Sequence, residues 1–63
     1  MYKQETFTSM AQGTNTIGRV LQHLCQKAID LVNENEAELV SLDHTINTSS
    51  CLVSVVVVYK TNP

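Results

Sequence analysis

The sequence is poor in cysteine and in the residues that break regular structure. Its 63 residues include no tryptophan, one proline, two glycines and two cysteines. Two cysteines that are far apart and lack a Cys-x-x-Cys spacing cannot form the dense disulfide framework of small secreted domains. We therefore expect Cys25 and Cys51 to be free thiols in a reducing compartment, with one structural bridge as the alternative.

Positive charge is also scarce. Four basic residues stand against six acidic ones, and the formal net charge is −2. The bases are scattered, so the chain has no basic stripe that would neutralise a row of phosphates. We expect no nucleic acid among the partners of this protein.

Long apolar runs are missing as well. No run approaches the length of a membrane span. The first residues, MYKQETFT, contain no apolar core of the kind that a secretory signal needs. We expect a cytoplasmic protein that has no membrane partner.

The length allows one domain, residues 1–63. A domain of this size buries a small share of its surface and is marginal unless disulfides, a metal or oligomerisation add to its stability. Because the residues support neither a disulfide framework nor a metal site, oligomerisation is the expected source of additional buried area.

An amphipathic helix is predicted from Ile17 to residues 33–36, where asparagine can serve as a left-handed C-cap. Residues 2–8 before it are rich in strand formers, and residues 9–13 are small and polar, as in a loop. A side chain among residues 14–16 is expected to cap the helix. Apolar residues cover about half of the helix circumference, which indicates that a neighbour covers one flank: Ile17, Val20, Leu21, Leu24, Cys25, Ala28, Ile29, Leu31 and Val32.

Two strands are predicted after the helix. From Glu38 to Ile46 the residues alternate, with Val40, Leu42, His44 and Ile46 on one face. Residues 47–50 form a turn cluster. Residues 51–60 form a last strand that is apolar on both faces, because Val55 to Val58 is a continuous valine run.

These elements predict an α+β fold of the order β-α-β-β. A helix between the first two strands favours a parallel crossover, and the short turn makes the third strand antiparallel to the second. The most apolar strand belongs in the centre, so the mainly antiparallel three-stranded sheet has the order 1-3-2, with the helix packed on one face. The second apolar row of the last strand would then face water, which favours a homo-oligomer. Which row faces the helix stays open.

The order strand–helix–strand–strand resembles dodecin, a small flavin-storing dodecamer. Dodecins stack flavin on a tryptophan, which this chain lacks.

Residues 31–42, followed by residues 52–60, resemble a family of short uncharacterised bacterial and phage proteins. Its members carry a Leu-Asn-Glu…Gly-Trp-Glu-Leu-Val-Ser run after a helix, then a strand hairpin. The chain keeps Glu38 to Ser41 (ELVS) and has Glu36 and Ala37 where Gly-Trp would be. This resemblance implies a βαββ fold and no catalytic residue.

One stretch has the composition of an anion-binding loop. Residues 13–20 read GTNTIGRV, with four residues between the two glycines and a cation after them. A nucleotide-hydrolysing P-loop has lysine and then serine or threonine at the places that Arg19 and Val20 occupy, and valine cannot bind magnesium. Hydrolysis is therefore excluded. The free amides and dipole of a helix N-terminus favour an anion, so the candidate ligand-binding residues are Gly13, Thr14, Asn15, Thr16 and Arg19. The alternative is an ordinary capped helix after a flexible loop.

The sequence contains no set of nucleophile, base and orienting group. His23 falls on the polar helix face, and we interpret it as solvated. His44 falls on the apolar face of its strand, and we expect it to be packed in the interior or in an interface. No metal site and no cofactor are expected.

The leading hypothesis is a non-enzymatic homo-oligomer that binds or sequesters a small anionic ligand, such as a nucleotide, at subunit boundaries. The alternatives are a protein-interaction module, acting as an inhibitor or adaptor, and a small enzyme that shares His44 between subunits.

Overall fold

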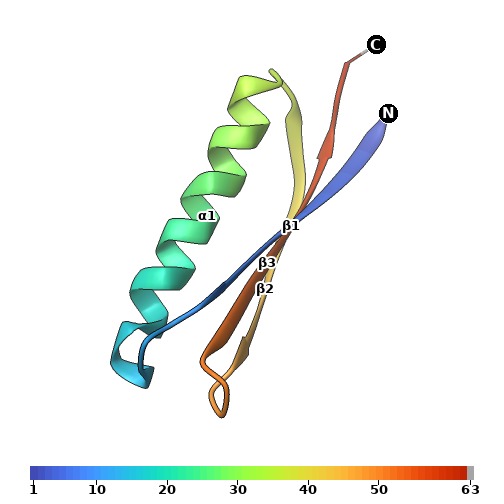
Figure 1. Ribbon diagram of the computed structural model, residues 1–63. Coiled ribbons are helices and arrows are strands. Elements are labelled where there is room, and N and C mark those ends of the chain that lie inside the picture. Colours follow the sequence, from blue (N-terminus) through green and yellow to red (C-terminus); the bar gives the residue numbers. More distant parts are fainter. Residues whose placement is uncertain (63) are drawn as a thin grey trace.

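The computed structural model describes residues 1–62 and contains one helix packed against one three-stranded sheet (Figure 1). The predicted order β-α-β-β is confirmed. The regular elements are β1 (Tyr2–Met10), the short 3₁₀ helix η1 (Thr14–Thr16), α1 (Ile17–Glu34), β2 (Glu38–Asn47) and β3 (Leu52–Lys60).

The strands lie in the order β1-β3-β2, and β3 pairs antiparallel with both neighbours. This confirms the predicted topology: the valine-rich strand is central, and the crossover through α1 leaves β1 and β2 parallel on the two edges. Val55 marks the middle of the sheet, since its Cα partners are Phe7 on β1 and His44 on β2. Both edges of the sheet therefore carry free backbone groups along a strand of nine or ten residues.

The core lies between α1 and one face of β3. Val53, Val55 and Val57 are fully buried there, and Tyr59 continues their row. From the helix, Leu24, Ala28 and Val32 meet this row at steps of four residues, which places them on one side of α1. The question of which row of β3 faces the helix is thus resolved in favour of the odd-numbered row. Ala28 has no exposed surface, so its small side chain lets the helix approach the sheet closely.

The sheet face away from α1 is less apolar than the sequence alone indicates. Val56 and Val58 are half-buried in its centre. Polar residues flank them: Gln4 pairs with Val58, and both Thr6 and Asp43 pair with Val56. Farther along, Thr8 and Ser54 share a hydrogen bond of 3.2 Å between their hydroxyls. The even-numbered row of β3 is therefore a narrow apolar band that polar residues flank in the middle of the sheet, while Tyr2, Met10 and Leu52 remain exposed toward its ends. We call this surface the open face.

Three local expectations are corrected. Ser9 and Met10 belong to β1 rather than to a loop, because their pairing with β3 continues to Leu52. At the end of α1 the left-handed residue is Glu36, with a φ of 50°, rather than an asparagine. Asn35 instead caps the helix through its side chain, which donates to the Leu31 carbonyl at 2.8 Å.

The third correction concerns the predicted face of β2. The register shifts between Leu39 and Ser41, so Val40 lies in a β-bulge and leaves the row that it was expected to share with Leu42. The residues that pair opposite the buried row of β3 are Leu39, Leu42, His44 and Ile46.

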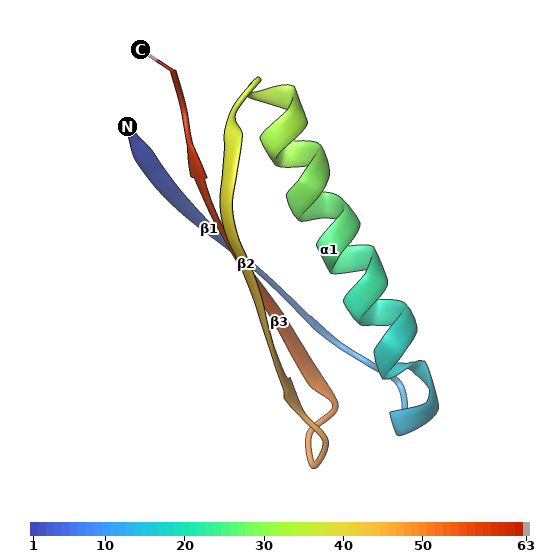
Figure 2. The same cartoon turned by 180° about the vertical axis from the view of Figure 1, so that it is seen from behind.

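The molecule is elongated, with extents of 42 × 15 × 12 Å. Its accessible surface of 4451 Å² exceeds the about 4,000 Å² that is typical of a folded chain of this mass. Figure 2 shows the reason: a single helix runs alongside a narrow, twisted sheet, and no second layer covers the sheet from behind. Within residues 1–62, no helix is both long enough and apolar enough to cross a membrane.

Candidate functional site

The predicted anion loop lies between β1 and α1. Its conformation is fixed by Thr16, whose hydroxyl donates to the Gly13 carbonyl at 2.9 Å and accepts from the Gly13 amide at 3.2 Å. Thr16 is the N-cap residue of α1, but its side chain makes no bond to the first turn of the helix. The amide of Ile17 instead donates to the Thr14 carbonyl of η1. The hydroxyl of Thr16 is thus used to close the loop on itself.

The structure places the five candidate residues in two groups. Thr14 and Asn15 are exposed and Gly13 is half-buried, around η1. Arg19 is exposed and lines a different feature, a shallow hollow of about 310 Å³ on the solvent side of α1, together with Gln22, His23 and Gln26. No residue of the loop lines that hollow. Within one chain, Arg19 and the loop therefore do not share one pocket, and the ligand-binding role of these residues stays a prediction.

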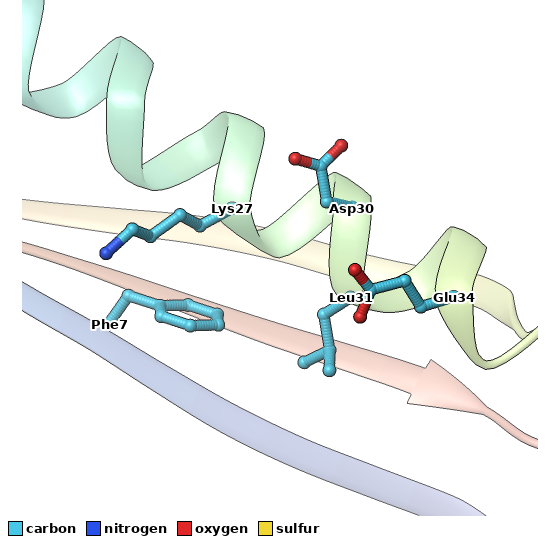
Figure 3. A pocket seen from close by; sticks show the side chains of 5 residues that line it. All are labelled: Phe7, Lys27, Asp30, Leu31 and Glu34. Carbon is cyan, nitrogen blue, oxygen red and sulfur yellow. The ribbon is translucent and has the colours of Figure 1, made fainter.

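A second hollow, of about 290 Å³, lies between β1 and the C-terminal half of α1 (Figure 3). Phe7 and Leu31 form its apolar floor, and the Lys27 side chain extends from α1 over the Phe7 ring. Asp30 and Glu34 lie along its rim. The charged side chains of this hollow are thus one cation and two carboxylates. The hollow brings together no nucleophile with a base. Its main significance is that Phe7 and Leu31 seal the helix onto β1.

The two histidines lie on different elements. His23 is exposed on α1, as predicted, and Asp43 and His44 are neighbours on β2 that face opposite sides of the sheet. Cys25 and Cys51 are both free and half-buried, as expected. Among the described residues, no group of three histidine, cysteine or acidic side chains is placed to hold a metal ion. No polar or charged side chain in this part of the chain is buried.

His44 corrects one expectation. In the single chain it is exposed rather than packed in the interior. The reason is that α1 packs less closely on β2 than on β1 and leaves His44 uncovered, although His44 pairs opposite the buried Val55. The second half of that expectation, a place in an interface, stays a prediction.

The most distinctive surface lies on the side of β2. Lys27 and Leu31 of α1 face β1, and the other flank of the helix, centred about 140° around it, carries Leu21, Cys25 and Ile29. That flank faces the β2 edge of the sheet. Apolar side chains on both elements remain in water: the exposed fraction is 46% for Leu39, 36% for Ile46 and 40% for Ile29. We call this the β2-side surface; it consists of Leu39, Leu42, His44 and Ile46 of β2 and Leu21, Cys25 and Ile29 of α1.

The sequence contained a signal for this surface. The apolar stripe of the helix is wider than one sheet face can cover, and Ile29 is the member that the structure leaves exposed. What the sequence did not reveal is the side on which the cover is missing. That depends on the offset of α1 toward β1 and on the bulge at Val40, which are both results of packing.

Comparison with known proteins finds no relative of this chain. No family model, no curated protein and no solved structure matches this chain. The resemblances to dodecin and to the short bacterial and phage family therefore stay predictions.

Proposed function

We propose that this protein is a non-enzymatic homo-oligomer that acts by binding, and that the β2-side surface is its protein interface. The single observation that carries the proposal is that Leu39, Ile46 and Ile29 all remain exposed on the β2 side of the molecule. Grouped apolar side chains in water are typical of association surfaces, whereas single ones are common on any protein. A small domain with one uncovered side gains stability when an identical subunit covers it.

The distribution of titratable groups supports binding rather than catalysis. Catalytic groups are commonly held in clefts where burial and neighbouring charges adjust their protonation. Here His23 and His44 are both exposed and belong to different elements. Neither hollow of the surface pairs a histidine with a carboxylate or a thiol.

The small anionic ligand that the sequence predicts has less structural support than the protein interface. Such a ligand would contact the exposed Thr14 and Asn15 at the end of the molecule where residues 48–51 also turn (Figure 1). Arg19 would have to reach it from the solvent side of α1. The ligand is thus a separate proposal, because the protein interface on β2 does not depend on it.

The interface is tested by paired charge substitutions. Leu39→Lys with Ile46→Lys places two cations on the β2-side surface and should reduce the solution mass from a multiple of 7.0 kDa to 7.0 kDa. The matched control is Tyr2→Lys with Met10→Lys, because both residues are 66% exposed and lie on the open face of β1. The control should assemble like the wild type. Light scattering after size-exclusion chromatography measures each mass. A wild-type mass of 7.0 kDa up to submillimolar concentration would overturn the proposal.

A further inference from the structure

The two edges of the sheet differ in how well they are protected against pairing with another strand. Natural proteins protect edge strands with charges, bulges or covering elements. β1 carries Lys3 and Glu5, and α1 packs against Phe7 beside them. β2 has its bulge at Val40, near one end, which leaves the stretch from Ser41 to Asn47 regular. Asp43 carries the only full charge of that stretch near neutral pH. The regular part of β2 is therefore the less protected edge.

The same stretch is complementary to itself. Two copies related by a two-fold axis through the sheet pair antiparallel, and directly opposite residues share a face. If His44 lies on the axis, Leu42 faces Ile46 of the partner subunit, so the two apolar residues meet on the helix side. On the other face Asp43 meets Thr45 of the partner subunit. If the axis instead passes through Asp43, two carboxylates face each other, which is destabilising.

From this we infer that β2 is a homodimer seam, in which residues 41–47 pair with the same residues of a second copy in the register that has His44 on the axis. The inference rests on the proposed homo-oligomer and names its geometry. The product is a continuous six-stranded sheet with both helices on one side, whose β1 strands form the outer edges. The seam is about 24 Å long, at about 3.4 Å per residue.

The accessible surface of the single chain is large enough for such an interface. A stable interface buries on the order of 800 Å² on each partner. That is under a fifth of the 4451 Å² that the chain exposes. Side chains on both faces of β2 contribute, and so do the backbone groups of the free edge.

The register gives the assembly a dependence on pH. Two facing histidines are compatible when neutral, and they repel one another once both are protonated in acid. Within residues 1–62, no charged group on the same face offsets this repulsion next to His44, which has Val55 across from it on β3 and Phe7 beyond on β1. The titratable group on the flank of α1 that faces β2 is Cys25, and Asp43 points to the opposite face. The dimer is therefore favoured at neutral pH and weakened in acid.

The arrangement also separates the seam from the predicted anion loop. The loop at residues 13–16 lies at the same end of the molecule as the turn after β2 (Figure 1). Antiparallel pairing of β2 therefore places the two loops on opposite sides of the two-fold axis, each beyond one end of the seam. A ligand that bridges both loops is not part of this assembly.

Cysteine scanning measures the register directly. In a background with Cys25→Ser and Cys51→Ser, the variants Asp43→Cys, His44→Cys and Thr45→Cys are oxidised with oxidised glutathione and resolved on non-reducing gels. Only the residue on the axis faces itself. In the inferred register, Thr45 is displaced from Thr45 of the partner subunit by about 7 Å along the strand, in addition to the strand spacing, which exceeds the reach of a disulfide.

We expect His44→Cys to cross-link at least about tenfold faster than its two neighbours. The dissociation constant of the wild type should rise about tenfold or more between pH 8 and pH 5, and His44→Gln should remove most of that rise. A dimer that cross-links fastest at Asp43→Cys or Thr45→Cys, or at none of the three, overturns the register and leaves the proposed homo-oligomer standing. A wild-type protein that is monomeric at every concentration overturns both.

Discussion

The two edge strands are both paired to β3, but they have different surroundings. β1 lies under the side of α1 that carries Lys27 and Leu31, and its Phe7 is half-buried there. On β2, Leu42 is half-buried against the core, but α1 packs less closely there and leaves His44, Ile46 and Leu39 exposed. One helix cannot cover both halves of a sheet, and this chain uses its helix for β1. The comparison identifies β2 as the half that needs a cover from outside the chain.

The largest expected contrast is between truncations in the two halves. Phe7→Ala should lower the free energy of unfolding by about 2 kcal/mol, because the ring contacts α1 and is partly buried there. Ile46→Ala should cost less, about 1 kcal/mol, at high dilution, since 36% of that residue is already exposed. Urea denaturation of both variants at micromolar concentration measures the difference.

Phe7→Ala and Ile46→Ala should also differ in how their stability costs depend on protein concentration. Because association stabilises the folded state by mass action, the cost of Ile46→Ala should grow with protein concentration, and the cost of Phe7→Ala should stay the same. Equal costs at high dilution, or a concentration dependence that is the same for both variants, would contradict the assignment of the uncovered half.

A smaller contrast concerns the threonines that flank Ser54. Thr8 on β1 bonds the Ser54 hydroxyl at 3.2 Å, and Thr45 on β2 is the other Cα partner of Ser54. Thr8→Ala should cost about 0.5–1 kcal/mol in the single chain. Thr45→Ala should be close to neutral at high dilution and should weaken association, since Thr45 faces Asp43 of the partner subunit in the inferred seam. Thermal unfolding over a concentration series tests both, and a Thr45→Ala cost that does not change with concentration would count against the seam.

Much of the fold was predictable because it depends on short-range patterns. The apolar period of three and four residues predicted α1 from Ile17, and the valine run predicted a central β3. The pattern failed where a local choice is decided by packing. The bulge at Val40 moved one residue out of its row, and Glu36 took the left-handed position that asparagine usually fills.

The candidate site was less predictable for the same reason. The residues around Gly13 have the composition of an anion loop, but composition does not show that the Thr16 hydroxyl turns back to Gly13. Nor does it show that Arg19 belongs to a separate hollow. The exposed side of β2 follows from the tilt of α1 over the sheet, which depends on the packing of Phe7 and Leu31 and has no signature in the sequence of β2 itself.

Hydrogen exchange along the two edges tests the central claim most directly, namely that β2 is the edge that pairs with a second copy. Alternate amides of each edge strand point away from β3. At high concentration and neutral pH, those of residues 41–47 should be protected nearly as well as the amides of β3, and the protection should vanish on dilution or acidification. The outward amides of β1 should exchange fast under all these conditions. Equal, fast exchange at both edges of the concentrated protein would contradict the account.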